Sequence, residues 1–180
     1  SLPAIVEAAG EIPVGARLAA ATNDDITQMI KAGIDFLVFD VEQTEATALL
    51  NEELGHIAIL TNANTADDDL RLLQPLELDA LLIPSSKDTL SVHDQLLTRR
   101  IAELTHKPLI VPVTTDISST TLQVLRDAGT PIVLTSNTNI SALEHLVANA
   151  RDVPPPREAH AERPSPLLPT APPPALEEPE

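Results

Sequence analysis

The chain has 180 residues and a formal charge of −16 at pH 7, with 27 acidic side chains against 11 Lys and Arg. A nucleic-acid-binding protein needs a basic face that neutralises phosphates, so this charge argues against nucleic acid and against an anionic membrane surface as partners. No stretch approaches about 18 consecutive apolar residues and the first residues lack a signal-peptide pattern, so we expect no membrane span and a cytoplasmic location.

Six short apolar runs recur along the chain, and the segments between them show helical periodicity. A strand that is apolar on both faces needs cover on both faces, which parallel sheets obtain from crossover helices. The expected strands are residues 14–19, 36–39, 57–60, 80–83, 109–113 and 132–134. The expected helices are residues 2–10, 24–32, 44–54, 66–73, 91–105, 118–128 and 140–150.

The joints between helix and strand resemble those of the (β/α)-barrel, or TIM-barrel, superfamily. They read AGIDFLVF at 32–39, LDALLI at 78–83 and AGTPIVL at 128–134. The resemblance covers most of residues 1–152 and implies an α/β fold. A whole barrel has eight strands and about 250 residues, whereas six strands are expected here. The chain is therefore expected to form a partial TIM-like barrel of about six βα units, with an open flavodoxin-like, doubly wound sheet as the alternative.

Residues 153–180 differ in character from residues 1–152, since they contain ten prolines interspersed with Glu and Ala. Such a segment cannot bury enough apolar surface to order itself, and it favours extended polyproline II. We therefore expect two parts, a βα-repeat domain over residues 1–152 and a disordered proline-rich tail or linker over residues 153–180.

Carboxylates follow two of the expected strands, where the functional groups of parallel α/β folds gather. Asp40, Glu42 and Asp116 could bind Mg²⁺ or another hard divalent ion through their oxygens. The segment FLVFDVE at 36–42 is similar to the metal-side strand of aldolases that act on pyruvate-like substrates. The alternative expectation is that no cofactor is bound.

Other polar residues at the same strand ends could act on a substrate. Lys87 could hold an anion or act as an amine with a lowered pKa, and His93 could act as an acid or base. Asn62 and Thr115 are expected to contact the substrate. Arg17, the one charged residue inside an apolar strand, is expected to bind substrate or to pair with Asp40.

The same strand ends also have an explanation without chemistry, because each is the beginning of a helix. Ser, Thr, Asp and Asn there cap free N–H groups, at about 1 kcal/mol each. The expected caps include Asn23 or Asp24, Thr65, and Ser91 in a capping box with Asp94. The loops after the last two expected strands, residues 114–116 and 136–139, contain no glycine, so a standard phosphate cradle is not expected.

Two functions remain open. The first is a non-catalytic, barrel-derived interaction or scaffold subunit, a homo-oligomer or part of a complex that covers the open sheet edges. The second is a metal-dependent lyase or aldolase-like enzyme that acts on a small carboxylate. The chain has only two aromatic residues, Phe36 and Phe39. Tight ligand pockets usually use aromatic side chains, so this composition favours the interaction subunit.

Overall fold

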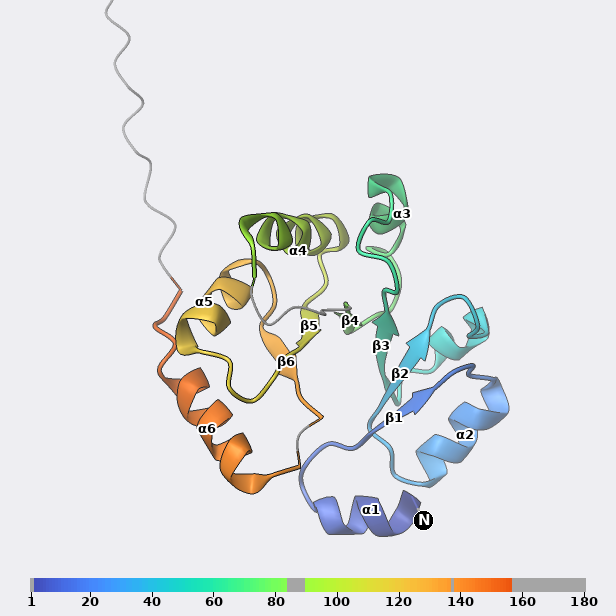
Figure 1. The fold of residues 1–180 in the computed structure, drawn as a ribbon. Coiled ribbons are helices and arrows are strands. Elements are labelled where there is room, and N and C mark those ends of the chain that lie inside the picture. Colours follow the sequence, from blue (N-terminus) through green and yellow to red (C-terminus); the bar gives the residue numbers. More distant parts are fainter. Residues whose placement is uncertain (1, 84–89, 137, 157–180) are drawn as a thin grey trace, which may run out of the picture.

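Six parallel strands form one curled sheet, and the helices that join them lie on its outer side (Figure 1). The computed structural model describes residues 2–83, 90–136 and 138–156. Neighbouring strands in the sheet are consecutive in sequence, in the order β1-β2-β3-β4-β5-β6. The strands are β1 (Gly15–Leu18), β2 (Phe36–Asp40), β3 (Gly55–Ile59), β4 (Ala80–Leu82), β5 (Leu109–Pro112) and β6 (Ile132–Leu134).

Helical segments precede β1 and follow every strand. Among the described residues they are α1 (Leu2–Ala9), α2 (Asn23–Lys31), the 3₁₀ helix η1 (Ala46–Leu50), α3 (Asp67–Leu72), α4 (Val92–Thr105), α5 (Ser119–Asp127) and α6 (Ile140–Arg151). None of these is long and apolar enough to cross a membrane.

This topology is that of an incomplete barrel, as the sequence predicts. A doubly wound sheet reverses its strand order near the middle and carries helices on both faces. Here the order never reverses and the sheet curls around an inner face (Figure 1). The flavodoxin-like alternative is therefore wrong.

The helix predicted over residues 44–54 is wrong as well, because only the five-residue η1 forms there. Glu45, at the N-cap position of η1, makes no side-chain capping bond. At the other end Asn51 has an extended backbone, and its Oδ1 accepts a hydrogen bond of 2.9 Å from the N–H of Glu53. With no N-terminal cap and a competing turn at Asn51, the segment does not extend into an α-helix.

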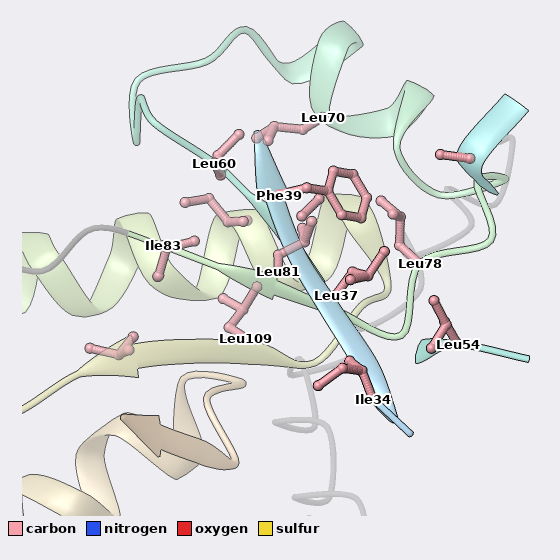
Figure 2. Packing of buried hydrophobic residues seen from close by; sticks show 14 of the residues in the cluster. Ile34, Leu37, Phe39, Leu54, Leu60, Leu70, Leu78, Leu81, Ile83 and Leu109 are labelled. Carbon is pink, nitrogen blue, oxygen red and sulfur yellow. The ribbon is translucent and has the colours of Figure 1, made fainter. Parts of the chain in front are cut away.

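The main core lies between the sheet and the outer helices (Figure 2). Leu37, Leu81 and Leu109 point outward from three strands and are at most 1% exposed. They meet Leu70 of α3 and Ile101 of α4 in the same cluster. Burial of such side chains stabilises a fold by about 1.5–3 kcal/mol each, so this layer supplies most of the stability.

The predicted proline-rich tail lies mostly outside the described residues, which end at 156. The segment just after α6 is tied to the domain by Arg126 of α5, whose Nη1 donates to the carbonyl of Pro154. The division into a domain of residues 1–152 and a tail of residues 153–180 stays a prediction.

Candidate functional site

Asp40 is the last residue of β2, and its carboxylate stabilises the turn that follows. Its Oδ1 accepts a hydrogen bond of 2.9 Å from the backbone N–H of Glu42. An Asp side chain that bonds the backbone two residues on forms a local turn without any ligand. The pair predicted between Asp40 and Arg17 is not among the ion pairs of the described residues. Arg17 lies opposite Val38, and Asp40 is two residues further along β2 on the same face.

A pocket of about 460 Å³ opens beside the carboxyl ends of β2 and β3, next to α3. Its apolar part includes Leu60 and Leu81, which are buried, and Leu73, which is half-buried. Of the predicted site residues, the pocket brings together Glu42 and Asn62. The polar residues that line it are Glu42, Thr61, Asn62, Asn64, Thr65 and Asp69.

The polar side of this pocket is fixed by hydrogen bonds within the protein. Asn62 Oδ1 accepts from the N–H of Asn64 at 2.8 Å. Arg100 of α4 donates from Nη2 to the carbonyl of Thr65 at 2.7 Å and from Nε to Asp67 at 2.7 Å. The pocket therefore has a defined shape, and its two carboxylates, Glu42 and Asp69, would repel a small anion.

Asp116 lies in the loop after β5, where its neighbours stabilise the ionised form. The hydroxyl of Thr114 donates to the Asp116 carboxylate and is the main cause of its lowered pKa. Its own backbone N–H and the charge of His145 lower that pKa further, whereas desolvation raises it. Asp116 is thus held as a carboxylate by local groups.

The remaining predicted site residues are not gathered around one centre. Thr115 is half-buried next to Asp116, and His93 is exposed near the start of α4. Lys87 lies outside the described residues. Within residues 2–83, 90–136 and 138–156, no three His, Asp or Glu side chains lie where they could hold a metal ion. The structure does not bring Asp40, Glu42 and Asp116 together as a metal site.

The concave side of the sheet is a second candidate surface, which we call the inner face. Successive side chains of a strand point to opposite faces, so every second residue faces away from the helix-covered core. Its members include Arg17, Val38, Asp40, Ile57, Ile59, Leu82, Ile110, Ile132 and Leu134. Arg17 and Asp40 are charged, and the others are apolar.

The inner face is open toward β6. Ile132 and Leu134 are 42% and 47% exposed, whereas Val38 and Ile57 near the middle of the sheet are half-buried. Arg17 is exposed at the opposite edge, and within the described part of the chain it forms no ion pair. An exposed apolar surface of this kind marks an interaction site.

An unclosed barrel is expected from the sequence to expose its inner face, but the sequence does not identify the residues that form it, and the reason is physical. Alternation of apolar and polar residues normally separates the two faces of a strand. Strand β5 is apolar on both faces, and in β3 the one polar side chain, His56, faces the core. A usable signal was Arg17, since a charged residue inside an apolar strand indicates the less buried face.

Comparisons with known proteins support the fold but do not indicate a function. No protein-family model matches the chain, and no curated protein matches it in sequence. Among solved structures, FabK from Thermotoga maritima, a TIM-barrel protein, superposes with a TM-score of 0.51 at 12% identity. A point mutant of the same FabK also superposes with a TM-score of 0.51 at 12% identity.

The superposition covers 75% of this chain and 46% of FabK, or 49% in the mutant structure. The chain therefore spans about half the length of the barrel protein that it resembles. At this identity the likeness concerns the fold alone, in agreement with an incomplete TIM-like barrel.

Proposed function

We propose that this domain is a non-catalytic interaction subunit, and that it joins a larger assembly through its inner face. The observation that carries the proposal is the exposure of Ile132 and Leu134, at 42% and 47%, on a sheet surface whose charged members, Arg17 and Asp40, lie in β1 and β2. In a closed barrel such side chains fill the interior. Here they lie beside a free sheet edge, where unpaired backbone groups also favour association.

The lyase alternative has no specific observation in its favour. Such an enzyme would need a hard cation to bind its carboxylate substrate, and no described group of residues is arranged to hold one. The pocket beside β3 carries Glu42 and Asp69, which would repel that substrate.

The test is the mass of the particle that contains this chain, isolated with its partners from the cells that make it. Sedimentation velocity should give a mass well above the 19.2 kDa of one chain. Leu134→Lys should lower the measured mass toward that of the single chain, because the substitution puts a charge into the contact. A wild-type chain that is recovered from those cells at the mass of the single chain, and that unfolds cooperatively, would refute the proposal.

A matched control is available on α6. Val147 is aliphatic and 47% exposed, the same fraction as Leu134, but it lies on an outer helix. Val147→Lys should leave the assembly intact. Equal loss in both variants would mean that added charge, and not the inner face, is responsible.

A further inference from the structure

A second pocket, of about 390 Å³, lies at the amino ends of β3 and β4, between residues 49–56 and residues 77–79. We propose that this pocket, which we call the histidine pocket, binds a small aliphatic ammonium compound. The charged nitrogen of that compound donates to Nε2 of His56 and is held by the carboxylates of Glu52 and Glu77. The histidine pocket is separate from the inner face, so this site goes beyond the proposed assembly and does not depend on it.

The apolar part of the histidine pocket comes from the segment that forms η1 in place of a longer helix. The chain leaves η1 at Leu50 and turns at Asn51, whose Oδ1 accepts a hydrogen bond of 2.9 Å from the N–H of Glu53. Four leucines from this segment and from the one before β4 line the pocket, namely Leu49, Leu50, Leu54 and Leu78. Leu54 and Leu78 belong to the core shown in Figure 2. Such side chains suit the hydrocarbon part of a small ligand.

His56 brings an unpaired hydrogen-bonding atom to the histidine pocket. It is a lining residue, its side chain is 4% exposed, and its buried Nε2 has no hydrogen-bond partner. Phe39, which meets the ring edge-on, is not a lining residue, so the pocket lies on another side of the imidazole. The χ2 torsion of histidine has broad preferences, and a turn of the ring directs Nε2 toward a bound donor. Buried polar atoms in proteins have partners as a rule, and the ammonium group would supply this one.

The carboxylates of the histidine pocket determine the charge of its ligand. Glu52, Glu77 and Asp79 line the pocket, and none of them is among the ion pairs of the described residues. Asp79 Oδ2 accepts a hydrogen bond of 2.6 Å from the backbone N–H of His56. Lys107 donates to the carbonyl of Leu76, next to Glu77, at 2.8 Å. The pocket therefore attracts a cation and repels a carboxylate or a phosphate.

An ammonium group fits this set of acceptors better than a metal ion does. Within residues 2–83, 90–136 and 138–156, no three His, Asp or Glu side chains are placed to hold a metal ion. An ammonium group carries three donors and needs only acceptors within reach. A neutral imidazole and two carboxylates are such acceptors, and hydrogen bonds between charged groups are among the stronger ones.

Titration of the isotope-labelled chain with butylammonium chloride, followed by NMR of the backbone amides, tests the proposal. A neutral imidazole is needed, so the titration is done at about pH 8, with about 150 mM NaCl to screen weak attraction to the acidic surface. We expect shift changes at residues 49–56 and 77–80, with a Kd on the order of millimolar. Butanol and butyrate have the same alkyl chain without the positive charge, and both should bind at least about tenfold more weakly.

Three variants test the residues. His56→Leu should weaken butylammonium binding by at least about tenfold, because it removes the acceptor. Glu52→Gln should weaken it by at least about threefold. The matched control is Glu53→Gln, which makes the same change of charge in the same loop at a residue that does not line the pocket. Glu53→Gln should bind as the wild type does.

Several results would overturn the proposal. Butanol or butyrate that binds as tightly as butylammonium would show that the pocket does not select positive charge. Equal losses in Glu52→Gln and Glu53→Gln would mean general attraction to an acidic chain, and wild-type affinity in His56→Leu would remove the imidazole from the site. Shift changes that spare residues 49–56 and 77–80 would place the cation elsewhere. None of these results bears on the assembly through the inner face, which Leu134→Lys tests.

Discussion

His56 begins the row of β3 residues that face the core, and it is the one imidazole buried among the described residues. Its side chain is 4% exposed, and its Nε2 has no hydrogen-bond partner. The ring meets Phe39 edge-on, with centroids 6.2 Å apart and planes at 78°. A buried polar atom without a partner costs about 1–3 kcal/mol, so this histidine lowers stability.

We expect His56→Leu to raise the free energy of unfolding by about 1 kcal/mol, because it removes the unsatisfied atom and keeps a similar volume. Urea denaturation measures this. Leu37→Ala, at a position that is 1% exposed, should lower the same quantity by about 2–5 kcal/mol. A clear loss of stability in His56→Leu would show that the ring nitrogen has a stabilising partner.

Asp25 stabilises the beginning of α2 only while it is ionised. It is the third residue of a capping box with Thr22, whose hydroxyl donates to Asp25 Oδ2 at 2.7 Å and whose N–H donates at 3.0 Å. The hydroxyl is the main cause, and the N–H the second cause, of a lowered Asp25 pKa. The pKa of Asp25 in the folded protein thus lies below its ordinary value of 3.8. Its stabilisation of α2 is fully present above pH 3.8 and is lost as the pH falls through the lowered pKa.

Asp25→Asn should therefore lower the urea midpoint at pH 7, and the difference from the wild type should shrink as the pH falls through the lowered pKa. The measurement is a set of denaturation curves between about pH 7 and pH 3. Asp24→Asn is the control, because Asp24 lies in the same first turn and accepts no capping bond from Thr22. A difference that is independent of pH would contradict the role of the carboxylate.

Helix α5 ends at a glycine that two constraints require. Gly129 has φ of +95°, in the left-handed region, and a Cβ added to it would collide with the Cβ of Ala102 in α4. Gly10 also has a positive φ, of +62°, but an added Cβ would meet nothing within 4 Å. The two glycines therefore separate backbone strain from crowding between helices.

Gly129→Ala should lower the free energy of unfolding by about 2–4 kcal/mol, the sum of left-handed strain and overpacking. Gly10→Ala should lose only the strain, about 1 kcal/mol. Equilibrium unfolding of both variants gives the comparison. If the two losses are equal, α4 moves away from α5 at little cost.

At the scale of elements, the sequence predicts the strands well because each is a short apolar run between turn residues. Helix beginnings are predicted less well, since several polar residues compete for each cap. Ser91 forms the expected box with Asp94, but α2 is capped by Thr22 instead of Asn23 or Asp24. At α3 the expected cap Thr65 bonds the carbonyl of Asn62 instead.

The site is less predictable than the fold, because it depends on the curl of the sheet. Glu42 and Asn62 follow adjacent strands and do share a pocket. Asp116 follows β5, two strands away from β3, and its neighbours are Thr114 and His145. Position along the chain identifies strand ends but does not say which of them converge.

At the scale of the whole molecule, the charge acts against the compact state. Four ion pairs are described, and the side chains of Arg71 and Asp68, for example, are 55% and 93% exposed. Exposed pairs contribute about 0–1 kcal/mol each. They cannot offset the mutual repulsion of a chain with a net charge of −16.

Added salt should therefore stabilise this protein. Screening shortens the range of repulsion from about 30 Å at 10 mM to about 8 Å at 150 mM ionic strength, so the melting temperature should rise by a few degrees over that interval. Calorimetry in NaCl and in KCl should agree, since the effect is not ion-specific. The double variant Glu52→Gln with Glu53→Gln, both exposed loop residues, should respond less to salt. A melting temperature that falls with salt would mean that favourable ion pairs outweigh the net repulsion.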